Sequence, residues 1–259
     1  MSTHEDITAS LTAIYGSFIS IGYIDNDQVS WAPHIDGSLS NQDCKANGMS
    51  DNAIELLKKI PWPKDSYHEL IKNSTPVQYF KSEEIKRSRH LTTADLDEED
   101  LELDCYLPPQ MITLIIGEYD EGLTYVLKAE KGKLYCHSLG EATALTITGT
   151  IVSLWKDNGF PEPEGQTATD FFDELIRKYK DLIQIPADHK IHDESTGMVS
   201  ASNHYAGANI DDEQRPGWIY GKLKQRLFDH GWPDDFDGEA FNANLTKVIE
   251  DWDNEVYEE

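Results

Sequence analysis

Three short segments between residues 111 and 138 constrain the fold of this chain more than any other feature. Residues 111–116 (MITLII) are mostly β-branched and apolar, residues 123–128 (LTYVLK) alternate, and residues 133–138 (KLYCHS) follow a further turn. β-branched and aromatic residues favour strands, and loops as short as these join antiparallel neighbours. The pattern predicts an antiparallel meander over about 111–138, inside a sheet core of about 107–140.

Apolar residues with helical spacing flank this sheet core on both sides. Residues 7–19 carry one apolar stripe, which Gly22 ends. Further helices are predicted at 51–60, 144–155, 168–185, 218–228 (with Gly231 as its C-cap) and 236–252. Connecting loops are expected at 23–49, which contains one short strand, and at 187–214, with an extended segment at 76–80. We therefore expect a single α+β domain over 1–259, with a central antiparallel sheet packed by N-terminal and C-terminal helices and a helical C-terminal part at about 167–256.

The charge balance limits the kinds of partner that the chain can bind. Twenty-two Lys and Arg residues stand against 48 Asp and Glu residues, which leaves a net charge of −26. Nucleic acids and anionic membranes attract positive surfaces, so we expect neither of them as a direct partner. A basic protein partner fits the charge. The predicted contact residues come from the acidic stretch 92–104 and the loop 117–122, and they are Asp97, Glu98, Glu99, Asp100, Glu118, Tyr119, Asp120 and Glu121.

Cysteine and histidine positions give no catalytic or metal-binding pattern. Cys44, Cys105 and Cys136 are too few and too scattered for a disulfide framework, which indicates free thiols in a reducing compartment. We interpret Cys136 as a small buried apolar residue. His189 and His192 are three residues apart, but they lie in a turn-rich acidic segment, so a surface position is favoured over zinc. We expect no cofactor, no metal and, with no leader or membrane-spanning segment evident, a cytoplasmic location.

Two other functions remain open at this point. A carboxylate-based hydrolase needs only two suitably spaced acids, and residues 117–122 (GEYDEG) are where we would place them. An inhibitor that mimics nucleic acid would instead carry rows of carboxylates on one face. Trp62, Trp218 and Trp232 lie beside proline or glycine at helix boundaries, which favours packing over helix ends and leaves a binding role as the alternative.

Several signatures in this sequence resemble those of known proteins. They are IPWP at 60–63, PPQMITLIIGEYDEGLTYVLKAEKGKLY at 108–135, FFDELIRKYKDLIQIP at 171–186 and LFDHGWPDDFDGEAF at 227–241. The chain resembles a group of uncharacterised fungal proteins over about 50–245, and over 108–140 it is similar to the SUKH superfamily of cell-wall-assembly regulators and toxin-immunity proteins. The resemblance implies an α+β fold and a non-catalytic protein-binding role. It carries no catalytic residue over to this chain.

Overall fold

The computed structural model describes residues 4–34, 39–64, 68–71, 74–89, 107–117, 122–138, 166–187, 197–199, 210–243, 245, 247, 248 and 251. Over these residues the chain is an α+β protein with an antiparallel sheet, as predicted. The predicted helix at 144–155 lies outside the described residues.

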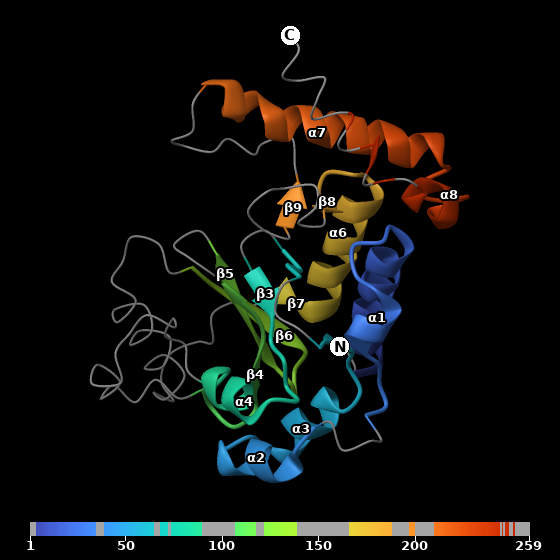
Figure 1. Cartoon of the computed structure of the whole chain (residues 1–259). Coiled ribbons are helices and arrows are strands. Elements are labelled where there is room, and N and C mark those ends of the chain that lie inside the picture. Colours follow the sequence, from blue (N-terminus) through green and yellow to red (C-terminus); the bar gives the residue numbers. More distant parts are fainter. Residues whose placement is uncertain are drawn as a thin grey trace. The chain divides into compact units, whose positions relative to one another are not determined.

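The sheet has five strands in the order β3-β4-β5-β6-β7, and every neighbouring pair is antiparallel. The predicted meander is confirmed as β4 Met111–Gly117, β5 Leu123–Lys128 and β6 Lys133–Ser138 (Figure 1). The edge strand β7 Gln166–Thr167 is not predicted from the sequence, and β3 spans Ser74–Pro76, whereas the predicted extended segment is 76–80. Strands of two or three residues carry too little periodicity to be recognised from sequence.

Nearly all of β4 is buried, which explains why its sequence does not alternate. Its residues from Met111 to Ile115 are buried, and the pairing with β5 shifts register between Thr113 and Ile115. Helices from both ends of the chain contact this sheet. Phe171 of α6 Ala168–Lys180 packs on Tyr125 with ring centroids 4.7 Å apart, and the ring Nε2 of His4 in α1 His4–Ser20 lies 3.3 Å from the Ala129 carbonyl oxygen. The contacts confirm a sheet packed by N-terminal and C-terminal helices.

Close contacts divide the chain into two compact units. Unit 1 contains residues 1–12 and 27–172, and unit 2 contains residues 13–26 and 173–259. Helices α1 and α6 each contribute residues to both units. The single domain over 1–259 stays a prediction.

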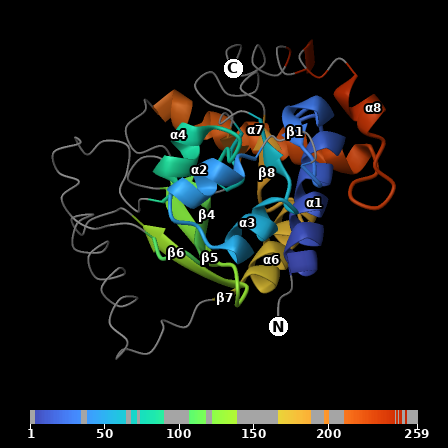
Figure 2. The ribbon, with the colours of Figure 1, turned by 90° about the horizontal axis from the view of Figure 1, so that it is seen from below.

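Among the described residues of unit 1, three short helices lie beside the sheet. They are α2 Asn41–Ala46, α3 Asp51–Leu57 and α4 Ser82–Arg87, and Figures 1 and 2 place them together at the end of the sheet where β4 begins. The predicted helix at 51–60 is confirmed in α3, although its last turn is not α-helical. Helices α2 and α4 have six residues each, too few for an apolar stripe, and they were not predicted.

The 3₁₀ turn Asn26–Gln28 leads into a small ribbon that is also in unit 1. In this ribbon β1 Val29–Ser30 pairs with β2 Trp62–Pro63. The single short strand expected within 23–49 is therefore present. Trp62 is 2% exposed and stacks on His34 with ring centroids 4.0 Å apart, so it packs in the core instead of being presented to a partner.

Unit 2 corrects three predicted boundaries. Helix α6 ends at Lys180 and not at 185, because Leu182 adopts a left-handed conformation with φ 52°. Residues 185–187 then form β8, which pairs with β9 Gly197–Val199 inside the predicted loop 187–214. Helix α7 Ile210–Asp229 begins eight residues before Trp218 and ends two residues before Gly231, whose φ of 86° matches its predicted capping role.

The last predicted helix, 236–252, is not continuous. Helix α8 Gly238–Asn242 begins at the Asp237 cap and ends where Ala243 takes ψ 118°, and residues 245, 247, 248 and 251 are helical again. Arg226 of α7 explains the break. Its guanidinium donates hydrogen bonds to the carbonyl oxygens of Phe241 and Ala243, and thereby satisfies groups that a continuing helix would have used.

Candidate interaction surface

All eight predicted contact residues lie outside the described residues. Residues Asp97–Asp100 belong to the segment 90–106, and Glu118–Glu121 belong to the segment 118–121. The structure does describe the residues that flank both segments. These anchors give the geometry of the candidate surface.

Arg89 and Leu107 hold the two ends of segment 90–106 together. The Leu107 backbone N–H donates to the Arg89 carbonyl oxygen at 2.9 Å. The Arg89 guanidinium donates to the carbonyl oxygens of Leu107 and Pro108, the latter at 3.0 Å. The residues that flank segment 90–106, which has the densest negative charge in the sequence, are therefore held next to each other.

The Arg89 side chain is almost entirely inside the protein, with 1% of its surface exposed. Its remaining nitrogen atoms also donate to backbone carbonyl oxygens, Nε to Asn47 at 3.1 Å and Nη1 to Met111. These acceptors lie at the end of α2 and the start of β4. A buried guanidinium is tolerated only when its donors are satisfied, so this one charge joins α2, β4 and the base of segment 90–106.

Two buried hydroxyl groups, those of Thr113 and Tyr79, donate hydrogen bonds to the backbone near Arg89. The Thr113 hydroxyl donates to the Ser88 carbonyl oxygen at 2.7 Å, and the Tyr79 hydroxyl donates to the Thr113 carbonyl oxygen at 2.5 Å. Burial raises the pKa of Tyr79 well above its ordinary value, although Ser88 and the charge of Arg89 act in the other direction. Tyr79 is therefore a hydrogen-bond donor throughout the physiological pH range.

Segment 118–121 has a narrower base, made by Gly117 and Gly122. A side-chain Cβ added at Gly117 would lie 2.5 Å from the backbone carbon of Gly122, which is closer than van der Waals contact permits. The Gly117 N–H donates to the Thr124 hydroxyl at 3.0 Å, and the Leu123 N–H donates to the buried Ser74 hydroxyl at 2.9 Å. The predicted hairpin between β4 and β5 is confirmed by its strands.

The two bases lie at opposite ends of strand β4. Arg89 bonds to Met111, where β4 begins, and Gly117 is where it ends. At a rise of about 3.4 Å per residue the two ends of this strand are about 20 Å apart. The two acidic segments are predicted to form one contact region, whereas the structure anchors them at opposite ends of β4.

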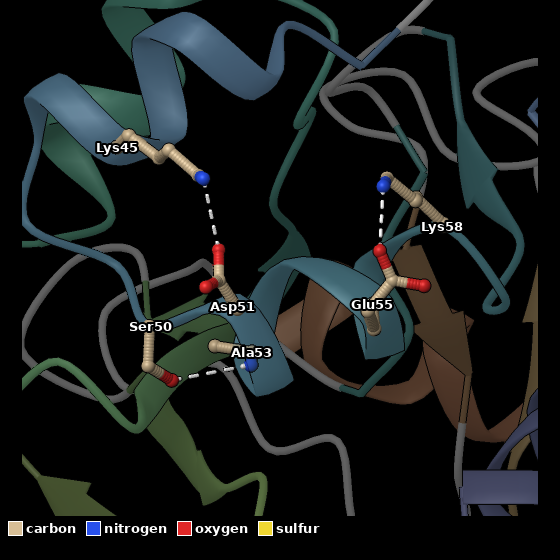
Figure 3. A network of polar contacts seen from close by, with 6 residues as sticks. All are labelled: Lys45, Ser50, Asp51, Ala53, Glu55 and Lys58. Carbon is tan, nitrogen blue, oxygen red and sulfur yellow. Dashed lines mark hydrogen bonds and ion pairs between the residues drawn. The ribbon is translucent and has the colours of Figure 1, made fainter.

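Other acidic side chains in unit 1 have local structural roles. Figure 3 shows Lys45 paired with Asp51 at 3.0 Å and Lys58 paired with Glu55 at 2.6 Å, while the Ser50 hydroxyl caps α3 by accepting from the Ala53 N–H. Lys58 lowers the pKa of the Glu55 carboxyl by hydrogen bonding and by its charge. Exposed pairs such as these contribute little to stability and do not by themselves form a binding site.

The described cysteines are not activated nucleophiles. Cys44 is buried, and burial together with the neighbouring Asp43 raises the pKa of its thiol to about 11. Cys136 is exposed, so the prediction that it is buried is wrong. Cys136 pairs with Tyr125 of β5 and lies beyond the part of β6 that β7 covers, since β7 pairs only with Lys133 and Leu134. Partial desolvation nevertheless raises the pKa of Cys136, so both thiols are protonated at neutral pH.

The part of the chain that the structure describes shows neither a metal site nor a binding site built on Trp232. Within those residues, no group of three His, Cys, Asp or Glu side chains could hold a metal ion. His189, His192 and Cys105 lie outside them. In unit 2 the Trp232 indole donates to the Lys180 carbonyl oxygen at 2.9 Å, so this tryptophan packs over the end of α6, as predicted.

Comparisons with known proteins identify no relative. No family model matches the chain, and neither a curated protein nor a solved structure matches it significantly. Among the described residues, no helix combines the length and apolar character needed to cross a membrane. Arg89 is the residue that sequence analysis missed, since an arginine between polar residues in KRSRH carries no sign of burial.

Proposed function

We propose that this chain is a non-catalytic, acidic protein-binding module, similar in role to the SUKH regulators, and that its partner is a basic protein. The observation that carries the proposal is the net charge of −26, concentrated most densely in the seven acidic residues and no basic residue of 92–104. A surface with this charge speeds the encounter with a basic partner and disfavours acidic ones.

The anchors of segment 90–106 support the proposal. A charged segment that is free at both ends loses more conformational entropy on binding than one whose ends are already held together. Arg89 fixes both ends at the start of β4 through backbone hydrogen bonds. Asp97, Glu98, Glu99 and Asp100 lie in the middle of that segment, and we assign them the main contact with the partner.

The chemistry of the described side chains also favours binding over catalysis. Burial keeps the Cys44 thiol protonated, and the buried Tyr79 hydroxyl is committed to the Thr113 carbonyl oxygen. The hydrolase alternative depends on Glu118, Asp120 and Glu121, which lie outside the described residues.

The test neutralises the proposed contact residues without changing their size. We expect the quadruple variant Asp97→Asn, Glu98→Gln, Glu99→Gln and Asp100→Asn to bind a synthetic lysine-rich peptide about tenfold more weakly than the wild type, which is about 1.4 kcal/mol for four exposed charges. Isothermal titration calorimetry at low ionic strength measures the change. Added salt should reduce the difference between the two proteins, because it screens exposed charges.

A control with the same change in net charge separates a contact site from overall charge. The variant Glu83→Gln, Glu130→Gln, Asp173→Asn and Asp234→Asn alters four exposed acids on other elements. We expect it to weaken binding less than threefold, which is about 0.6 kcal/mol. Equal losses in the two quadruple variants would show that the peptide responds to net charge alone, and the assignment of the contact residues would then be wrong.

A further inference from the structure

We draw no further inference here: the strongest candidate, the pair of exposed apolar side chains of Ile183 after the end of α6 and Phe228 on α7 in unit 2, has both acidic and basic residues near it in the sequence, and nothing in the structure shows what covers it.

Discussion

Arg89 places a positive charge inside unit 1, where water cannot compensate it. Its guanidinium donates to the carbonyl oxygens of Asn47, Leu107, Pro108 and Met111 instead. Each of these carbonyl groups depends on the same side chain for that hydrogen bond. At the scale of single residues, Arg89 therefore has more structural consequences than any ion pair on the surface of α2 or α3.

Replacing Arg89 with methionine should destabilise the protein strongly. The methionine side chain fills part of the volume but removes the guanidinium that donates to the buried carbonyl oxygens of Leu107 and Met111, and we expect a loss of about 3–5 kcal/mol in the free energy of unfolding. Urea denaturation measures this quantity. The control is Arg87→Met, since Arg87 is exposed on α4 and lies 3.8 Å from Glu84, a contact that contributes no more than about 0.5 kcal/mol. Similar losses in both variants would contradict the role assigned to Arg89.

The buried thiol of Cys44 should make stability depend on pH in the alkaline range. Its pKa is about 11 in the folded protein, against an ordinary value of 9.0. Between these values the unfolded chain has lost the proton that the folded chain keeps, so stability is full below pH 9 and falls as the pH rises toward 11. A shift of this size corresponds to about 2–3 kcal/mol.

The variant Cys44→Ala isolates this contribution from the buried tyrosines, which titrate at higher pH and are the same in both proteins. Urea denaturation at pH 8 and pH 10 should show a smaller decrease in stability for the variant than for the wild type. If both proteins lose stability equally between these two pH values, Cys44 is not the titrating group.

At the scale of elements, the close approach of backbones decides where β4 can turn into β5. The hairpin closes at Gly117 and Gly122, and no side chain larger than a hydrogen atom fits between the two backbones. The residues of 118–121 between them include three acids and lie outside the described residues. Backbone contact, and not the composition of the loop, therefore fixes the end of the hairpin.

A pair of glycine-to-alanine substitutions tests this distinction. Gly117→Ala should destabilise the protein by about 1–3 kcal/mol, because the new methyl group forces the Gly122 backbone away. Gly16→Ala in α1 meets no atom within 4 Å, and it should stabilise the protein by up to about 1 kcal/mol because alanine favours a helix. Thermal denaturation followed by circular dichroism compares the two variants. A gain in stability from Gly117→Ala would show that the hairpin base is loose.

At the scale of the whole molecule, segment 90–106 is flanked by two residues, Arg89 and Leu107, that are hydrogen-bonded to each other. The hydrogen bond between the Leu107 N–H and the Arg89 carbonyl oxygen resembles one rung of an antiparallel ladder, in which paired Cα atoms are about 5 Å apart. Two residues are enough to span that gap. The hydrogen bond between Arg89 and Leu107 thus closes the base of segment 90–106. This closure does not depend on how many residues the segment contains.

Deleting residues 90–106 and joining Arg89 to Leu107 through Gly-Gly should leave a folded protein. Shortening a connection to this extent reduces the entropic cost of closing it by about 2 kcal/mol, which favours folding. Circular dichroism and a cooperative urea transition test the fold, and the lysine-rich peptide tests binding. Unfolding would contradict the closed base, whereas a folded variant that binds as well as the wild type would contradict the proposed function.

Some elements could be predicted from the sequence because their signals are local. The strands of the meander contain β-branched runs between glycine turns, and α1 has a complete apolar stripe from Ile7 to Phe18. Helices α2 and α4 and strands β3 and β7 are shorter than the periods that reveal such elements. The acidic residues of the candidate surface could be chosen from sequence, but the two places where their segments are anchored could not.

The sequence by itself determined the antiparallel meander, the helices with long apolar stripes and the net charge of −26, because alternation, helical spacing and ionisation belong to neighbouring residues. Only the tertiary structure decided that Arg89 is buried, that Cys136 is exposed and that the two acidic segments are anchored at opposite ends of β4. These properties depend on residues distant in the chain. Arg89 is buried because carbonyl groups up to 42 positions away surround it, and no local pattern encodes that arrangement.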